Sequence, residues 1–493
     1  MVRRTGLMDK MIRTLGALTI AVALLTSFTA CSNEDLLDNN AEQAQTQHIL
    51  VTAGANIDNN AATRSAVVKD GSTRALTFTA GDRLYISTAI SYSPHTVLAG
   101  YMTIAGTPAS GATNATFSAS YASDGTGDLK VYECQDDGTY VVVNHTFASE
   151  DVFSECTDIV RAMLVHKDAK NFVINGYNFN YASTIAPTVD ELMTQCLPVS
   201  GDFYGGNFQL SAGEGRGICP ILNCTVTGLE ANATYAVVPG VEFSEWEYDP
   251  VGVVKTDADG KAVFACTICG DEMEEKNYAI RFCNLNAPYT WKRVSLGSKL
   301  LSSKVYNVTR VADDDVASGF TFPTITGASF SSVDRYFNYI INGNAGALNF
   351  TLSETSKNVG ITMRNYSAAS VTLSGLNVTI DTNSSYLNFE ENGKDVTLTI
   401  DGDNTITLNN TQDCVWVAGN LKLSGNGTLT VHSQNNCFCG MYAYNYSYDN
   451  NSNSTTDVLD LSSQLAAPGH TVTRSARTGD SYSGYTWVYK VTD

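Results

Sequence analysis

The chain has 493 residues, of which 30 are basic and 50 acidic, and its formal net charge is −20. The first 31 residues hold four basic groups and one acidic group, a surplus of +3, so the rest of the chain carries about −23. Such an acidic surface speaks against nucleic acids and anionic lipids as partners, and it leaves neutral sugars and proteins open. The 25 tyrosines and only ten prolines are typical of extracellular proteins built from strands.

Residues 1–30 have the pattern of an export signal. Basic residues come first, an apolar run from Leu15 to Phe28 follows, and small residues precede Cys31. The apolar run is too short to be a spanning helix. Thr29-Ala30-Cys31 resembles the lipobox of bacterial lipoproteins, although Phe28 stands where leucine is usual. The resemblance implies a lipid-modified Cys31 and stable membrane anchoring. The alternative is an ordinary secretory signal with an incidental cysteine.

Residues 31–47 are polar and acidic, and we expect a flexible tether there. The acidic cluster after Cys31 resembles the surface-export signal of Bacteroidetes lipoproteins, and a tether without a signal is the alternative. Strand-like runs begin at residues 48–54 and 75–86, the second with a turn at Gly81-Asp82, and they recur to about residue 311. Their spacing predicts packed β-sandwiches, with one weak helical segment over 158–165.

Eleven cysteines remain beside Cys31. Cys266 and Cys269 have the spacing of half a zinc site, with Cys219 and Cys224 as possible partners, but no second Cys-x-x-Cys is present. We therefore expect buried thiols or a few disulfides.

A charged, small-residue linker is predicted to start at residue 312, and we place its end at 340. Residues 371–431 then repeat: apolar alternating runs start at Val371, Val396 and Leu421, with intervals of 25 residues. Shorter apolar runs lie between them, at 386–389 and 414–417. Several short strands per 20–30 residues, with Gly, Asn and Asp at the corners, predict a parallel β-helix over 341–493. Antiparallel hairpins of a sandwich are the alternative.

Aromatic residues in this part are candidates for carbohydrate binding. In an extended strand, four alternating tyrosines after the repeat would face one side. Such a row can stack on sugar rings, or it can be covered by packing on the flank of the β-helix. The candidates are Trp416, Tyr442, Tyr444, Tyr446 and Tyr448.

Residues 32–311 resemble the fimbrillin family of Bacteroidetes lipoproteins. The resemblance lies in the lipobox, in Leu76-Thr-Phe-Thr-Ala-Gly-Asp82, in Ser303-Lys-Val-Tyr-Asn-Val-Thr-Arg310, and in the first strand followed by two arginines. It implies two β-sandwich domains, 48–200 and 201–311. It also implies cleavage after Arg64 or Arg74, loss of strand 48–54, and donor-strand exchange with other fimbrial subunits. The alternative is that both arginines are ordinary loop residues and the lipid stays attached.

The part from about residue 340 resembles a bacterial carbohydrate-binding β-helix module, on Gly402-Asp-Asn-Thr-Ile-Thr-Leu408 and Gly425-Asn-Gly-Thr-Leu-Thr-Val431. Such modules imply acidic polysaccharide held through calcium, and the candidate ligands are Asp381, Asp401 and Asp403, with Asn404 nearby. The alternative is a ladder of Asn and Asp that satisfies corner backbone groups.

The sequence as a whole predicts an all-β protein with two fimbrillin-like β-sandwich domains and a short right-handed parallel β-helix. We expect a non-enzymatic lipoprotein of the outer membrane, held there only by its lipid, without a required cofactor. The 180 or so residues after the second sandwich argue against a shaft subunit. They favour a tip or accessory subunit that binds host or dietary glycans in adhesion. The alternatives are a polysaccharide-degrading β-helix enzyme and a membrane-anchored spacer.

Overall fold

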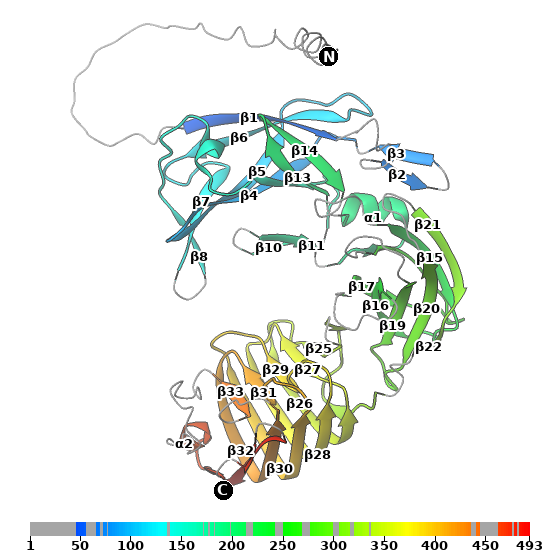
Figure 1. Cartoon of the computed structure of the whole chain (residues 1–493), viewed down its shortest axis with the longest axis vertical. Helices are drawn as coiled ribbons and strands as arrows, with labels where there is room; N and C mark the ends of the chain where they lie inside the picture. Colours follow the sequence, from blue (N-terminus) through cyan, green and yellow to red (C-terminus); the bar gives the residue numbers. More distant parts are fainter. Residues whose placement is uncertain are drawn as a thin grey trace, which may run out of the picture. The chain divides into compact units, whose positions relative to one another are not determined.

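The computed structural model describes residues 46–55, 66–69, 72–75, 77–135, 139–170, 172–175, 178–181, 183–197, 199–212, 220–241, 250–268, 277–298, 305–315, 320–334, 337–434, 440–443, 462–475, 478–480 and 483–493. Within these residues, nearly all regular structure is β, which confirms the expected class (Figure 1). The described helices are a 3-10 turn, Val152–Glu155, and two short helices, α1 (Val189–Gln195) and α2 (Ser462–Leu465). None of them is long and apolar enough to cross a membrane.

The N-terminal strands form one nine-stranded sheet in the order β1-β14-β13-β9-β4-β5-β6-β7-β8. The strands are β1 (Thr46–Ala55), β4 (Arg83–Tyr92), β5 (His95–Ile104), β6 (Asn114–Ala122), β7 (Leu129–Cys134), β8 (Tyr140–Val143), β9 (Arg161–Val165), β13 (Val199–Tyr204) and β14 (Asn207–Ala212). Alternate residues of these strands are buried, as in β6, where Phe117 and Ala119 point into the core. The core therefore follows directly from the alternation in the sequence.

Strand β1 closes this sheet on itself. It pairs antiparallel with β6 from Thr46 to Gly54 and parallel with β14 from Thr52 to Ala55. Val51 and Ala53 of β1 are buried, whereas Leu50 is 67% exposed. One strand thus occupies the space between two others while it contributes few side chains to the core.

One expectation for this part is wrong. The weak helix expected over 158–165 is strand β9, because Ala162 and Leu164 alternate into the core of the sheet. The unpredicted helix α1 lies further on, and the hydroxyl of Thr188 caps it by accepting a hydrogen bond from the Glu191 amide at 3.2 Å. The domain boundary expected at residue 200 falls inside β13, so residues up to Ala212 belong to the first sheet.

Two further sheets follow, and they enclose a second core that contains Tyr235, Phe264 and Phe282. One sheet has the order β12-β18-β15-β21 and the other β17-β16-β19-β20-β22. The strands are β12 (Ile185–Ala186), β15 (Ile221–Thr227), β16 (Thr234–Val241), β17 (Gly252–Lys255), β18 (Ala262–Thr267), β19 (Asn277–Asn284), β20 (Trp291–Ser298), β21 (Val305–Val311) and β22 (Asp313–Asp314). Two hairpins form separate sheets: β2 (Ala66–Lys69) with β3 (Ser72–Ala75), and β10 (Phe172–Asn175) with β11 (Asn178–Tyr181).

The cysteines in the described part are present as thiols, without disulfides between them: Cys134, Cys156, Cys196, Cys224, Cys266, Cys283 and Cys414. Among described residues no group of three or more His, Cys, Asp or Glu side chains is placed to hold a metal. Cys224 and Cys266 are buried in the second core, and Cys219 and Cys269 of the possible zinc site lie outside the described residues.

Burial makes several of these thiols unreactive. It raises the pKa of Cys156 and of Cys196 to about 11, and it raises the pKa of Cys283 well above the ordinary value. The thiolate is the nucleophile, so a raised pKa leaves little reactive form at mildly alkaline pH. We expect iodoacetamide to leave all three unmodified in the native protein and to alkylate them after denaturation, as peptide mass spectrometry would show. Equal labelling rates in both states would contradict this.

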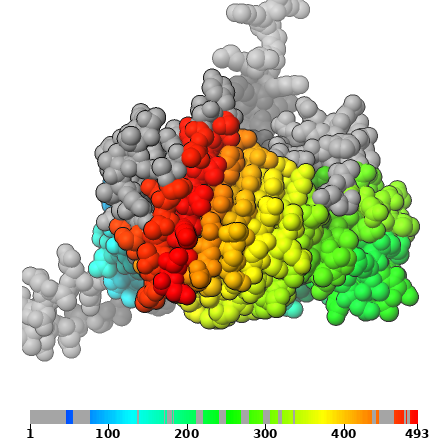
Figure 2. All heavy atoms as spheres, turned by 90° about the horizontal axis from the view of Figure 1, so that it is seen from below, coloured from blue at the N-terminus to red at the C-terminus, as the bar shows by residue number. Residues whose placement is uncertain are grey.

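The C-terminal part consists of stacked coils, each made of one long and one short strand. The long strands pair in parallel in the order β26-β28-β30-β32, and the short strands pair in parallel in the order β25-β27-β29-β31-β33. The long strands are β26 (Ala347–Lys357), β28 (Ala368–Ile380), β30 (Asp395–Leu408) and β32 (Asn420–Ser433). The short strands are β25 (Tyr339–Asn342), β27 (Ile361–Arg364), β29 (Leu387–Phe389), β31 (Val415–Val417) and β33 (Met441–Ala443). Figure 2 shows the coils as successive bands from yellow to orange, in chain order, with the C-terminal strands in red beside the last coil.

Antiparallel strands lie at both ends of the long-strand sheet. At the first end, β23 (Thr324–Thr326) pairs antiparallel with β26. In the short-strand sheet, β24 (Ser332–Val333) pairs antiparallel with β25 in the same way. At the other end, β36 (Gly484–Thr492) pairs antiparallel with β32 and also carries β34 (Thr471–Arg474) and β35 (Thr478–Asp480). The segment 312–340, expected to be a linker, therefore contains paired strands. Its Phe330 and Phe337 are buried in the core of the coils, because apolar side chains of this size are stabilised by burial.

The long strands bend at glycines that adopt positive φ, Gly375 (65°) and Gly402 (67°). Each directly follows a member of the pair Ser374–Asp401, where the register between β28 and β30 shifts. Asn404 follows the second bend and is 1% exposed. Its amide nitrogen donates to the carbonyls of Asp401 and Gly402 at 3.1 and 3.2 Å, and its carbonyl oxygen accepts from the Leu376 amide at 2.9 Å. One buried side chain thus satisfies backbone groups of two coils.

We expect Asn404→Ala to lower the free energy of unfolding of the coils by about 2–3 kcal/mol, because it leaves buried backbone groups without partners. Denaturant titration followed by tryptophan fluorescence would measure the change. Asp403→Ala, at the exposed neighbouring position, is the control and should be close to neutral. A neutral Asn404→Ala would mean that water replaces the amide.

The repeat is less regular than the sequence suggested. Val396 pairs with Leu421, as the interval of 25 predicts, but Val371 pairs with Leu398 and not with Val396. The similar segments 402–408 and 425–431 also suggest that Gly402 lies beside Gly425, but Gly402 pairs with Gly427. Both alignments were wrong by two residues, a shift that keeps the same side chains pointing inward because the strand period is two.

Candidate functional site

The outer face of the short-strand sheet is the candidate site. Each short strand has a residue between two buried apolar residues that lies on the other side of the sheet, as Asn388 lies between Leu387 and Phe389. This residue is partly exposed in β29, β31 and β33 and is buried in β25 and β27. The parallel register aligns these outward residues in one row: Ile340, Thr362, Asn388, Trp416 and Tyr442. The backbones of neighbouring members of the row are about 4.8 Å apart, the usual distance between paired strands.

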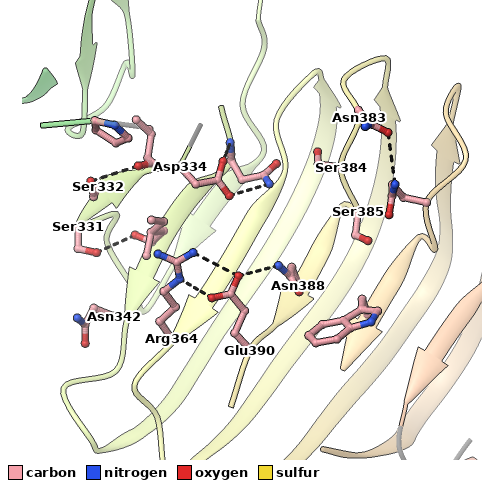
Figure 3. Close-up of a pocket in the computed structure, with 16 residues that line it drawn as sticks. Ser331, Ser332, Asp334, Asn342, Arg364, Asn383, Ser384, Ser385, Asn388 and Glu390 are labelled. Carbon is pink, nitrogen blue, oxygen red and sulfur yellow. Dashed lines mark hydrogen bonds and ion pairs between the residues drawn. The ribbon is translucent and has the colours of Figure 1, made fainter. Parts of the chain in front are cut away.

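A groove of about 1050 Å³ lies over this face. It is lined mainly by polar groups from the short strands and from the turns that precede them, and Figure 3 shows these side chains from several coils around a common space. The lining residues are Pro250, Ser331, Ser332, Val333, Asp334, Asn338, Ile340, Asn342, Arg364, Asn383, Ser384, Ser385, Asn388, Glu390, Gln412 and Trp416. Amide and hydroxyl groups dominate, so the groove offers both donors and acceptors.

An ion pair lies in the middle of the groove. Arg364 donates to both carboxylate oxygens of Glu390, from Nε at 2.5 Å and from Nη2 at 3.3 Å. Asn388 donates to the same carboxylate at 3.0 Å, so three side chains from two coils hold one another in place (Figure 3). Fork geometry of this kind fixes orientation as well as charge.

Trp416 ends the groove with an aromatic surface. Its indole stacks on the ring of Tyr442 from the next coil, with centroids 6.0 Å apart and planes inclined by 13°. Because Tyr442 lies against one face of the indole, the other face is turned toward the preceding coil, where Asn388 occupies the same row. Gln412, also in the lining, donates to Asn383 at 3.3 Å and joins two neighbouring turns.

At the opposite end the groove is rigid. Asn338 is 3% exposed, and it donates to the Asp334 carboxylate from its backbone and from its side chain, both at 3.0 Å. Its carbonyl oxygen lies over Gly360, where a Cβ would be 1.9 Å away, so only glycine fits there. The turn that carries Asp334 is thereby fixed on the edge of the groove.

The structure brings two of the five predicted aromatic residues together, Trp416 and Tyr442. Tyr444, Tyr446 and Tyr448 lie outside the described residues, as do the lipidation site Cys31 and the cleavage candidate Arg64. The backbone of Arg74, the other cleavage candidate, lies in β3 opposite Val67.

The three candidate calcium ligands do not converge. Asp401 accepts a hydrogen bond from Ser374 at 2.8 Å near the bend of the long strands. Asp381 follows the end of β28. It is about seven residues beyond Ser374, the partner of Asp401, and seven residues span about 20 Å in an extended strand. There it accepts from Asn409 at 2.6 Å, and its oxygen lies 3.9 Å from Lys357. Asp403 is exposed next to the bend. The contacts of Asn404 and Asn409 match the alternative, in which corner residues satisfy one another.

Sequence reasoning did not place Asn388, Glu390 or Gln412 at the site. A signal for them was present, because Asn388 and Trp416 occupy the same central position in the short apolar runs 386–389 and 414–417. Arg364 and Glu390 are 26 residues apart, and only the register between coils brings them together.

Comparison of the chain with protein-family models, with curated proteins and with solved structures gave no match.

Proposed function

We propose that this protein is a non-enzymatic cell-surface adhesin that binds glycans in the groove of its stacked coils. The observation that carries the proposal is the indole face of Trp416 next to a row of fixed amide and carboxylate groups. A pyranose ring has apolar C–H faces and a rim of hydroxyls. An aromatic plane suits its faces, and convergent amides suit its hydroxyls.

In this proposal the chain joins two fimbrillin-like β-sandwich domains to a right-handed parallel β-helix that carries the glycan site. A lipid on Cys31 would hold it at the outer membrane, or other subunits would hold it on a fimbria. The predicted export signal and the acidic composition support a surface location without nucleic-acid partners.

A glycan array probed with the purified full chain tests this function. We expect binding to a defined set of oligosaccharides, and Asn388→Ala should weaken it because the amide lies beside the indole in the row. If the chain binds no oligosaccharide on the array, the proposal is contradicted and the spacer function remains. Depolymerisation of a bound polysaccharide would favour the enzyme.

We further propose that β1 is an exchangeable strand. Its pairing with β6 on one side and β14 on the other supports this, since its removal would open two rows of backbone groups for a partner's extended segment. Cleavage after Arg64 or Arg74 would release it. The hairpin of Arg74 pairs with no other described strand, and two-stranded hairpins alone are marginally stable.

Strand β36 would not act as a donor in this assembly. Trp487, Tyr489 and Val491 of β36 are fully buried in the coils, so β36 is not available to complete a neighbour's sheet. A subunit that accepts a partner's strand and keeps β36 in its own core would suit a tip or accessory position.

Mass spectrometry of the N-terminus of protein taken from native cell surfaces tests this assembly. A start at Ser65 or Ala75 would support loss of β1. A lipid-modified Cys31 as the only start would contradict it and leave a permanently anchored protein.

A further inference from the structure

We propose that the groove selects a neutral, extended glycan chain that lies across the coils, and that the Arg364–Glu390 pair makes it discriminate against acidic polysaccharides. This inference rests on the proposed glycan-binding function and names its ligand class. It differs from the calcium-held acidic polysaccharide that the sequence resemblance implies.

The charged residues of the groove are the first reason to expect a neutral ligand. Of the residues that line it, Arg364 is the cation, and Asp334 and Glu390 are the anions. Recognition of a uronate or a sulfate needs a cation whose donors are available, and bidentate arginine is the usual solution. Here Nε and Nη2, which form one bidentate edge of the Arg364 guanidinium, donate to Glu390. An acidic sugar would have to displace this carboxylate while it also faces Asp334.

The net charge of the chain and the positions of the other carboxylates also disfavour an acidic polysaccharide. The whole chain carries −20, so the field at the surface repels polyanions before they reach the groove. A calcium bridge would need several convergent oxygen ligands. The predicted carboxylate Asp401 lies instead on the long-strand sheet and Asp381 directly after the end of β28, and each is hydrogen-bonded locally.

The shape of the groove gives the direction of the chain. The lining residues come from β24, β25, β27, β29 and β31 in turn, so the groove extends over four strand spacings, about 19 Å. Its outward residues recur once per coil. This interval is comparable to the advance per residue of an extended, equatorially linked pyranose chain. Such a chain would lie perpendicular to the strands, and its terminal ring would stack on Trp416.

Titration calorimetry on the full chain tests the proposal with neutral xylohexaose, cellohexaose and mannohexaose against hexagalacturonate, each with and without a calcium chelator. We expect at least one neutral hexamer to bind, with an affinity that salt and chelator do not change. Hexagalacturonate should bind at least tenfold more weakly. Equal or tighter binding of hexagalacturonate by the wild type would overturn the inference while the glycan-binding function stands. If no hexamer binds and the glycan array is also blank, the function itself fails.

A charge variant makes the test sharper. Glu390→Gln removes the carboxylate that occupies Arg364, and we expect it to raise the affinity for hexagalacturonate at least fivefold in low salt, and less in high salt. Asp381→Asn is the matched control, since it makes the same charge change beside Lys357 on the long-strand sheet, and it should leave the affinity unchanged. An equal gain in both variants would mean that only net charge matters, which contradicts a role for the pair. If Glu390→Gln does not fold, the wild type decides between the two ligand classes. Binding of a neutral hexamer that salt and chelator do not change supports the inference, and binding of hexagalacturonate that they weaken contradicts it.

Discussion

Trp416→Ala is expected to lower the affinity for the bound glycan by about tenfold or more and to leave the coils folded. An aromatic anchor in a binding site commonly contributes about 2 kcal/mol, and each 1.4 kcal/mol is a factor of ten. The indole is partly exposed at an outward position, so its removal takes little from the core. Titration with the best ligand from the array measures the affinity, and thermal unfolding measures the fold.

Two controls define the result. Tyr92→Ala removes an aromatic side chain that is 64% exposed on the first sheet, and it should not change binding. Trp416→Phe keeps a ring at the same position and should retain most of the affinity. Unchanged binding in Trp416→Ala would exclude stacking on the indole and with it the groove as the glycan site.

Trp487→Ala should lower the free energy of unfolding of the coils by about 3–5 kcal/mol, the usual cost of truncating a fully buried large aromatic residue. The indole has no exposed surface and lies on β36, between β32 and β34. A Cβ added to Gly440 would lie 3.1 Å from the indole, so the surrounding backbone is already close to it. Small residues cannot refill such a space, and a cavity would remain.

Chemical denaturation followed by circular dichroism measures this loss. The chain has several cores, so the transition of the coils should shift while another transition stays in place. Lys490→Ala is the control, because Lys490 is exposed on the same strand. A loss below 1 kcal/mol would mean that β36 is only loosely attached, and β36 would then be open to strand donation.

The sequence predicted the strands of the coils well, for a physical reason. In β30, Val396, Leu398 and Ile400 alternate with polar residues, and this alternation reports which side is buried. The same alternation could not fix the register, since a shift of two residues preserves it. Only the positions of the bends at Gly375 and Gly402 distinguish the two registers. The turns between the coils differ in length, so these positions could not be matched in the sequence.

The site was harder to predict than the strands. Trp416 was accessible to sequence reasoning because an aromatic residue flanked by Val415 and Val417 in an extended run must point outward. The Arg364–Glu390 pair was not accessible, because charges on successive coils meet only when the length of the intervening turns is known. The helix expected over 158–165 was wrong for a related reason. The buried alternation of Ala162 and Leu164 in the sheet prevailed over a weak local preference.

The antiparallel strands at the ends of the coils have a consequence for solubility. A stack of parallel strands presents unpaired backbone groups at its ends, on which a second stack could add without limit, as in amyloid growth. Here β23 covers the first long strand, and β36 with β34 covers the last. Reversal of strand direction breaks the repeat, so the edge that remains no longer matches the parallel edge of another copy. The long-strand sheet is thereby protected from end-to-end aggregation even at high protein concentration.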